Sequence, residues 1–338
     1  MHVFRTWSEV PAALKGGVIA LGNFDGLHRG HQAVIGRAVS LARKAGVAAA
    51  VMTFEPHPRM FFKPDQEPFR LSPFRMKAHV IEALGVDYLY VQTFDKEFSE
   101  RTPENFVSEI LVGGLGLSHI VVGYDYVFGY QRKGNVEVLR ELAAKYGFGV
   151  TAVEKLSEGA RRRASEEMPA FAGEERFSST AIRNLLREGR PREAARMLGR
   201  FWEIEGRVVA GDKRGRQLGF PTANLEYRDY LHPRKGVYAI RAGVDHGAGT
   251  VWHNGVANFG NRPTFDKTDV LLEAHLFDTN EDLYGKHLRV ALVEYIRAEK
   301  KFDGLEALKA QIAADSDEAR RLLAGFPNAP APFVGYTA

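Results

Sequence analysis

The chain has 338 residues, of which 45% are hydrophobic, and its formal net charge is +4. This length allows two domains of ordinary size, and the hydrophobic content favours packed cores over disorder. Cysteine is absent, which excludes disulfides, thiolate metal sites and cysteine nucleophiles. No secretory signal and no bilayer-spanning apolar run is found, so we expect a cytoplasmic protein without a membrane partner. The basic residues are scattered, which favours small phosphates over nucleic acid as partners.

Strand-like and helix-like segments alternate through the first half of the chain. The expected strands are 17–24, 48–54, 88–93, 119–123 and 150–154. The expected helices are 32–44, 75–84, 103–111 and 136–146. This alternation predicts an α/β domain, a doubly wound parallel sheet with helices on both faces. Residues 156–176 include three consecutive arginines and few apolar positions, which indicates a solvated loop more than a phosphate contact.

The character of the sequence changes in its second half. Two helices are expected first, over 179–187 and 192–198. The strands expected after them are 202–210, 237–244, 250–258, 270–277 and 288–297, and a final amphipathic helix is expected over 305–323. Strands at this spacing without helices between them indicate an antiparallel sheet or barrel. We therefore predict an N-terminal domain over 1–187 and a C-terminal all-β domain over 188–338.

The segment GNFDGLHRGH (22–31) lies between the first expected strand and the first expected helix. Its glycines permit a tight turn in which backbone N–H groups approach a ligand, and a helix N-terminus favours phosphate. His28 and His31 are three positions apart, so both can face one side of the first helical turn and donate hydrogen bonds to a triphosphate. Doubly wound sheets bind their ligands at this position. The segment therefore predicts a site for nucleotidyl transfer from ATP.

A zinc site is a weaker interpretation of this segment. Two histidines at this spacing could bind zinc, but the sequence nearby offers no evident third ligand and the chain has no cysteine. Neither a Walker A string nor a G-x-G-x-x-G fingerprint occurs at this turn, which argues against those two nucleotide-binding classes.

A second glycine-rich segment, GRVVAGDKRGRQLGFPTANLEY, covers 206–227. Its glycines permit a loop that folds closely over phosphates. Thr222 and Asn224 are two positions apart, so they point to the same face of an extended segment. Their oxygens are hard ligands that suit Mg²⁺, although Thr and Asn after a proline often form only a turn. The surrounding glycine pattern favours the ligand interpretation.

The first segment resembles the H-x-G-H nucleotidylyltransferases, and more narrowly the N-terminal module of prokaryotic bifunctional riboflavin kinase/FAD synthetases. The strings that carry the narrower resemblance are TFEPHP (53–58), GYDYVFGYQRKG (123–134) and FSSTAIR (177–183). The second segment resembles the riboflavin kinase signature, together with KGVYA (235–239), NGVANFGNRPTF (254–265) and LLEAHLFD (271–278). The strings match in the family's order over nearly the whole chain.

The resemblance implies two reactions with ATP, riboflavin and FMN as small-molecule partners. Riboflavin is phosphorylated to FMN, and FMN is then adenylylated to FAD with release of pyrophosphate. For the second reaction it implies catalytic roles for His28, His31 and Arg183. It implies ATP contacts there for Gly22, Asn23, Phe24, Asp25, Gly30, Ser179 and Thr180. It implies a flavin side made of Pro56, Pro58, Asp125, Phe128 and Arg132, with Asp125 and Arg132 open between flavin and ATP. The FMN phosphate is largely ionised at neutral pH, its second pKa being about 6, so its attack needs no side-chain base.

For the C-terminal domain the resemblance implies a six-stranded antiparallel barrel with a terminal helix. Glu273 matches the base that accepts the proton of the ribityl 5′-hydroxyl as that oxygen attacks the γ-phosphorus of ATP. The position of Glu273 in the strand does not by itself decide between this role and that of an outward-facing structural carboxylate. Implied ATP contacts are Gly211, Gly215, Arg216, Gly219, Thr222 and Asn224. Thr222 and Asn224 are also the implied Mg²⁺ ligands, and we expect a monomer or a weak homo-oligomer.

Two other functions stay open at this point. The H-x-G-H string alone permits transfer to another phosphate, such as phosphopantetheine, but the kinase-like second half does not favour it. A flavin-binding protein without turnover is the other. Intact reactive positions argue against it, namely His28, His31, Arg183, Thr222, Asn224 and Glu273.

Overall fold

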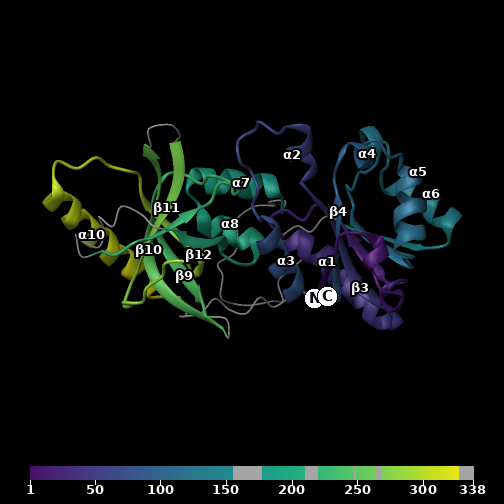
Figure 1. The fold of residues 1–338 in the computed structure, drawn as a ribbon, viewed down its shortest axis with the longest axis horizontal. Coiled ribbons are helices and arrows are strands. Elements are labelled where there is room, and N and C mark those ends of the chain that lie inside the picture. Colours follow the sequence, from purple (N-terminus) through teal and green to yellow (C-terminus); the bar gives the residue numbers. More distant parts are fainter. Residues whose placement is uncertain (155–176, 210–219, 247–248, 264–267, 327–338) are drawn as a thin grey trace. The chain divides into compact units, whose positions relative to one another are not determined.

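The computed structural model describes residues 1–154, 177–209, 220–246, 249–263 and 268–326 (Figure 1). They form two compact units, whose packing divides between Ser178 and Ser179. The segment Pro68–Leu71 belongs to the second unit, although the residues on both sides of it in the sequence belong to the first. The functional boundary between 187 and 188 stays a prediction. The loop predicted over 156–176 lies outside the described residues.

The first unit is built on a six-stranded parallel sheet of order β1-β4-β3-β2-β5-β6. Its strands are β1 (His2–Phe4), β2 (Val18–Leu21), β3 (Ala49–Glu55), β4 (Tyr88–Thr93), β5 (His119–Gly123) and β6 (Gly149–Val153). The doubly wound parallel sheet is confirmed. The sequence missed β1, which pairs with the edge of β4, because a strand of 3 residues carries too little periodicity to be recognised.

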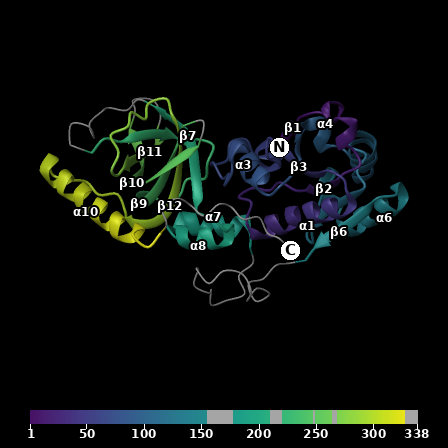
Figure 2. The same ribbon diagram turned by 90° about the horizontal axis from the view of Figure 1, so that it is seen from below.

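Helices cover both faces of this sheet (Figure 2). One face carries α1 (Arg29–Ala45) and α3 (Phe74–Ala83), and the other carries the π-helix η3 (Phe106–Gly114) and α6 (Val136–Tyr146). Successive residues of β2 point to opposite faces, so Ala20 packs in the core with α1 while Leu21 packs in the core with η3. The helix predicted over 103–111 begins as α5 (Pro103–Asn105) and continues as η3.

Several short elements were not predicted, because they are too short to show a helical period. They are α2 (Pro58–Phe62), α4 (Lys96–Ser99) and the 3-10 turns η1 (Trp7–Glu9), η2 (Ala12–Leu14) and η4 (Tyr130–Arg132). They surround the sheet and do not change its topology.

The chain order makes β2 the switch point of the sheet. From β2 the chain continues to β3 and β4 on one side, and later returns to β5 on the other. Because all three neighbouring strands are parallel, the carboxyl ends of β3, β2 and β5 lie side by side at one edge. This edge is where a doubly wound sheet binds its ligands.

The second unit contains a closed antiparallel barrel of strand order β10-β11-β8-β7-β12-β9. It begins with α7 (Ser179–Glu188) and α8 (Pro191–Leu198), which pack on each other. Its strands are β7 (Trp202–Val209), β8 (Ala223–Glu226), β9 (Gly236–Asp245), β10 (Thr250–Pro263), β11 (Thr268–Leu276) and β12 (His287–Arg297). The six-stranded barrel implied by the family resemblance is confirmed. Composition had indicated five of these strands and missed the short β8.

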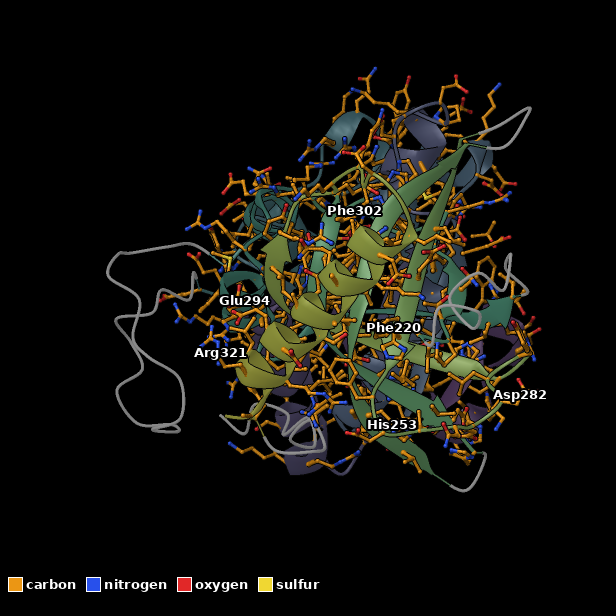
Figure 3. The ribbon with its side chains drawn as sticks, turned by 90° about the vertical axis from the view of Figure 1, so that its left-hand side faces the viewer. Phe220, His253, Asp282, Glu294, Phe302 and Arg321 are labelled. Atoms are coloured by element: carbon orange, nitrogen blue, oxygen red, sulfur yellow. The ribbon has the colours of Figure 1, made fainter. Side chains whose placement is uncertain are left out.

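The alternation along the strands separates the inside of the barrel from its outer surface. Leu225, Leu272 and Phe259 stand in one cross-strand row and are fully buried. Outside the barrel, α10 (Leu305–Leu323) lies against β9, β10 and β12 (Figure 3). A second, smaller core joins the helix to the strands, with Ala319 of α10 against Val237 and Val256. The predicted terminal helix is confirmed.

Candidate active sites

Three of the predicted motif segments meet at the carboxyl edge of the parallel sheet. The segment 22–31 follows β2, Pro56 and Pro58 follow β3, and Asp125 follows β5. Since β3, β2 and β5 are neighbours, residues far apart in the sequence are brought to one place. The fold thus explains how strings that are far apart in the sequence lie at one edge of the sheet.

The backbone of the 22–31 segment takes a conformation that few residues adopt. Phe24 and Leu27 have φ angles of 48° and 44°, and Gly26 between them has a φ of 84°. Positive φ is rare for bulky side chains, so the surrounding structure must hold this turn. The strand expected to reach residue 24 ends at Leu21 for this reason. Phe24 and Leu27 are buried at 2% and 0% exposure, which keeps the turn in place.

Two polar contacts hold the same turn from neighbouring elements. The hydroxyl of Thr53, on β3, donates to the carbonyl oxygen of Asn23 over 3.2 Å. The backbone N–H of Ser72 donates to Oδ1 of Asp25 over 2.9 Å. The contact of Ser72 with Asp25 is buried and therefore shielded from water, whereas that of Thr53 with Asn23 is partly buried. Asp25 is therefore engaged in shaping the loop, while Asn23 is exposed.

The two histidines lie together at the start of α1. His28 is the N-cap residue, and its Nδ1 accepts from the backbone N–H of His31 over 3.3 Å. A neutral His28 ring that accepts at Nδ1 carries its proton on Nε2, which makes Nε2 a donor. The two rings stack with centroids 3.7 Å apart. A Cβ at Gly30 would stand 3.1 Å from the His28 ring, so a larger residue there would push this ring away by a few tenths of an ångström.

The expected flavin side is a loop that follows β5. Phe128 is buried, and its ring contacts Phe106 at 5.8 Å and Tyr126 at 5.7 Å between centroids. Phe128 and Gly134 exchange backbone hydrogen bonds of 3.0 and 2.9 Å, which close the loop. Asp125 and Arg132 are exposed at its surface. The structure thus gives Phe128 a packing role and presents the two charged residues to solvent.

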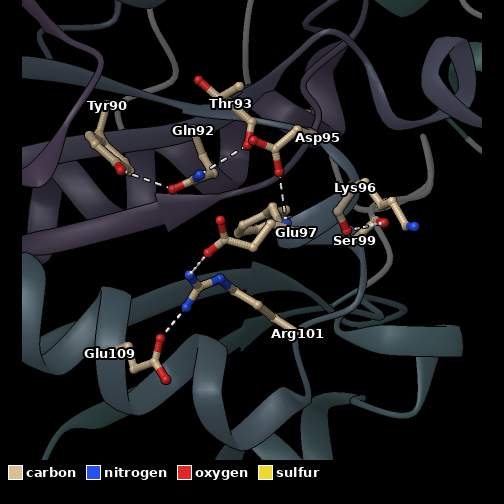
Figure 4. A network of polar contacts seen from close by, with 10 residues as sticks. Tyr90, Gln92, Thr93, Asp95, Lys96, Glu97, Ser99, Arg101 and Glu109 are labelled. Atoms are coloured by element: carbon tan, nitrogen blue, oxygen red, sulfur yellow. Dashed lines mark hydrogen bonds and ion pairs between the residues drawn. The ribbon is translucent and has the colours of Figure 1, made fainter.

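An arginine network supports this loop from the neighbouring segment (Figure 4). Arg101 donates to Glu97 of α4 over 2.6 Å and also pairs with Glu109 of η3. Its carbonyl oxygen accepts from the N–H of Tyr130, 2.7 Å away, at the tip of the loop. Arg101 therefore connects α4, η3 and the 123–134 loop.

The serine, threonine and arginine of the FSSTAIR string lie in the second unit, on α7. Ser179 is half-buried and Thr180 is exposed in the first turn of that helix. Arg183 is 9% exposed, and its Nε donates to the carbonyl oxygen of Phe69 over 2.8 Å. Its guanidinium also lies 5.2 Å from the centre of the Phe69 ring. The structure thus gives Arg183 a partner in the segment Pro68–Leu71.

The outer surface of the barrel carries a row of three polar residues. Glu273 of β11 lies opposite Asn224 of β8 on one side and opposite Asn258 of β10 on the other. Residues directly opposite in a sheet have Cβ atoms about 4.5–5.5 Å apart. Asn224 is 5% exposed, Asn258 is half-buried and Glu273 is exposed. The proposed base and one proposed metal ligand therefore stand next to each other.

The residues before Asn224 are held by the strand that carries Glu273. Nδ1 of His275 is 2.8 Å from the carbonyl oxygen of Pro221. The ring of Phe220, labelled in Figure 3, meets the His275 ring edge-on at 5.6 Å. Thr222 follows directly and is half-buried. Four further predicted ATP contacts, Gly211, Gly215, Arg216 and Gly219, lie outside the described residues.

No group of three or more His, Cys, Asp or Glu side chains suited to a metal occurs among the residues that the structure describes. The Thr222 hydroxyl and the Asn224 amide oxygen belong to a different donor type, the hard neutral oxygens that Mg²⁺ accepts. Asn224 is buried beside a carboxylate, which fits a site for a cation bound together with phosphates.

Two polar residues near these sites were missed. Asn258 stands beside Glu273, and only the strand register reveals it. Lys77 is 1% exposed on α3. Its sequence signal was available, because Val80 and Ile81 follow three and four positions later and place Lys77 on the apolar face of the helix.

The comparisons with known proteins agree over most of the chain. The family model described as FAD synthetase matches residues 10–167, and the one described as riboflavin kinase matches residues 198–323. A bifunctional riboflavin kinase/FMN adenylyltransferase from Escherichia coli K12 is 40% identical over 91% of this chain and 93% of that protein. The protein of the same name from Bacillus subtilis is 39% identical over 90% of this chain and 92% of that protein.

A solved structure also matches most of the chain. It is described as a macrolide-efflux protein from Streptococcus pneumoniae, and it matches with a TM-score of 0.78 and 29% identity over 94% of this chain and 98% of that one. In the described part of this chain, no helix is both long enough and apolar enough to span a membrane. On the strength of the two domain matches and the full-length relatives, the chain belongs to the family of bifunctional riboflavin kinase/FMN adenylyltransferases.

Proposed function

We propose that the barrel phosphorylates riboflavin and that the parallel-sheet unit adenylylates the FMN produced. In the first reaction the ribityl 5′-oxygen forms a bond to the γ-phosphorus of ATP. The bond from that phosphorus to the β-phosphate oxygen breaks, and ADP leaves. Because the nucleophile is a neutral alcohol, a base that accepts its proton is useful. Glu273 supplies it, on the exposed outer surface of β11.

We propose Thr222 and Asn224 as the residues that would hold Mg²⁺ in this reaction. When bound, the ion neutralises charge on the phosphates of ATP. Asn224 keeps its position through the pairing of β8 with β11, and Thr222 through the contact of Pro221 with His275. The pairing sets Asn224 opposite the proposed base, and Thr222 precedes Asn224 by two positions. The loop with Gly211, Gly215, Arg216 and Gly219 is proposed to cover the ATP phosphates.

In the second reaction an oxygen of the FMN phosphate bonds to the α-phosphorus of ATP, and pyrophosphate leaves. Both reactants are anions, so the protein must align them and offset their charge. We propose that His28 donates from Nε2 to the phosphates, with His31 and Arg183 as further donors. Backbone N–H groups of the 22–31 turn add to the favourable potential at the start of α1. No base is needed, because the attacking phosphate is already ionised.

The remaining assignments in this reaction follow the family resemblance. The proposed ATP loop contains Gly22, Asn23, Phe24, Asp25 and Gly30. We also propose that Ser179 and Thr180 contact the phosphates of ATP. Pro56, Pro58 and Phe128 are proposed for the flavin, and Asp125 and Arg132 for either ligand. The cytoplasmic location and the monomeric or weakly associated state stay predictions from the sequence.

One observation carries the proposal: the 22–31 turn, the 56–58 segment and the 123–134 loop meet at the switch point of the sheet. Purified chain incubated with riboflavin and Mg-ATP should yield FMN first and FAD later on chromatography. FMN supplied directly should yield FAD, whereas phosphopantetheine should not be adenylylated. Absence of both flavin nucleotides would refute the proposed function. If phosphopantetheine alone were adenylylated, transfer to that phosphate would be the function instead.

A further inference from the structure

Lys77 is a cation enclosed in the first unit. It lies on α3, and its side chain is 1% exposed. Its Nζ is 3.3 Å from Oγ1 of Thr53 and 3.3 Å from Oε1 of Glu55, both on β3. Removing an ammonium ion from water costs several kcal/mol unless it is paired and hydrogen-bonded. Lys77 is thus held by the end of β3 that points toward the carboxyl edge of the sheet.

The contact fixes the direction of the Thr53 hydroxyl. An ammonium group only donates, so Thr53 Oγ1 must accept from Lys77. A hydroxyl has one proton, and the contact to the carbonyl oxygen of Asn23 at 3.2 Å uses it. A relay therefore runs from Lys77 on α3, through Thr53 on β3, to Asn23 in the turn after β2. All members of this relay belong to the first unit.

The relay acts on the peptide between Asn23 and Phe24, next to an unfavourable backbone conformation. In a trans peptide the N–H points away from the preceding carbonyl, so fixing the Asn23 carbonyl also fixes the direction of the Phe24 N–H. Phe24 has a φ of 48°, a value that persists only when the surroundings impose it. The contact of Asp25 with Ser72, which lies two positions before α3, holds the next residue of the turn.

We propose that Lys77 is a positioning residue for FMN adenylylation, acting through Thr53 to orient the peptide between Asn23 and Phe24. It contacts neither substrate. Its effect is to keep the backbone N–H groups of the turn aligned with the ATP phosphates. The inference rests on the proposed placement of ATP at this turn. Charge at Lys77 is offset by Glu55, so the orientation of the peptide matters more than the field of the ammonium.

The test compares variants of the full chain in both reactions. Thr53→Val removes the hydroxyl and leaves no unpaired charge, and Lys77→Met removes the donor. Small misplacements of reacting groups cost up to about 10²-fold in rate. We expect each variant to lower kcat/KM for ATP in FMN adenylylation by about 10-fold to 100-fold, with riboflavin phosphorylation in the same protein unchanged. Thr53→Ser keeps the hydroxyl and should recover most of the activity, and Lys44→Met is the control for loss of an exposed lysine.

A relay also predicts that the two losses are not independent. The double variant Lys77→Met/Thr53→Val should be no slower than the worse single variant within about twofold, because either change breaks the same contact. Multiplied losses, wild-type adenylylation in Thr53→Val, or equal losses in both reactions would each overturn the proposal. Wild-type chain that makes no FAD would instead refute the proposed function, so the two failures are distinguishable.

Discussion

Asn224 and Glu273 lie directly opposite each other on β8 and β11, on the outer surface of the barrel. A residue proposed to bind the cation and a residue proposed to accept the proton are thus cross-strand neighbours. β8 is held on both sides, because it pairs with β11 through all four of its residues and with β7 through Asn224 and Leu225. The two roles can be separated by substitutions that change one side chain and leave the strands paired.

Glu273→Gln should remove the base and keep the shape of the site. General base catalysis contributes about 10²- to 10⁴-fold. We therefore expect kcat for riboflavin phosphorylation to fall by at least about 10²-fold, with FMN adenylylation unchanged. Product chromatography with riboflavin, and separately with FMN, measures both reactions.

Glu226→Gln is the matched control for this change. Glu226 is an exposed carboxylate on the same outer surface of β8, opposite Leu271. Its substitution should leave both reactions unchanged. Undiminished FMN formation in Glu273→Gln would show that Glu273 is a structural carboxylate, the alternative that its strand position leaves open.

Asn224→Ala should weaken the cation site. Loss of a residue that only supports a metal ligand already lowers the affinity for the metal by about 10- to 100-fold. We expect the Mg²⁺ concentration for half-maximal phosphorylation of riboflavin to rise by about tenfold or more. A magnesium titration at saturating ATP measures it, with Asn254→Ala on β10 as the control for loss of an amide. An unshifted midpoint would remove Asn224 from the ligand set.

The parallel sheet could be predicted because its strands are apolar and its helices have a clear period. Val18 to Leu21 are buried on both faces, and such a run is recognisable in the sequence. The end of β2 could not be predicted, because Phe24 looks like a further strand residue. Phe24 instead has a positive φ, and its neighbours Asn23 and Asp25 are held by Thr53 and Ser72, which the sequence does not place near them.

The barrel site shows the same limit. The residues of PTAN could be identified, but their neighbours depend on which strands pair. Asn258 and Glu273 are 15 positions apart in the sequence and directly opposite in the barrel, and only the register brings them together. Lys77 was recognisable as a lysine on an apolar helix face, yet its partners on β3 are a tertiary feature.

His28 has two roles that substitutions can separate. As the N-cap of α1 it accepts from the His31 N–H, and loss of such a cap costs about 1 kcal/mol. His28→Ala should lower both the stability of the first unit and FMN adenylylation. His28→Asn retains a capping acceptor and should be as stable as the wild type, but equally poor in adenylylation. Thermal unfolding and FAD formation measure the two effects, and riboflavin phosphorylation should be intact in both variants. If His28→Asn adenylylated FMN as well as the wild type, His28 would act only as the N-cap of α1.

Asp87 should make the stability of the first unit depend on pH in the acid range. Hydrogen bonds from Arg43 are the largest cause that lowers the pKa of this carboxyl, and the N–H of Ala49, 2.7 Å away, adds to them. Because the folded pKa lies below the ordinary value of 3.8, the stabilisation is complete above that pH and is lost as the pH falls through the folded pKa. Both side chains are partly exposed, so the contribution is below about 1 kcal/mol.

Asp87→Asn should therefore unfold at lower urea concentration than the wild type at pH 7, and the difference should shrink steadily as the pH is lowered below 3.8. The exposed Asp65 provides the control, since Asp65→Asn should leave the midpoint of urea unfolding unchanged from pH 7 to pH 3. Arg43→Met should reproduce the loss at pH 7, because it removes the same pair from the other side. If the gap between wild type and Asp87→Asn were constant from pH 7 down to pH 3, the ionised carboxylate would not be the source of the stabilisation. Since Asp87 ties the end of α1 to the start of β3, this measurement also reports how firmly the helix that begins at the histidines is attached to the sheet.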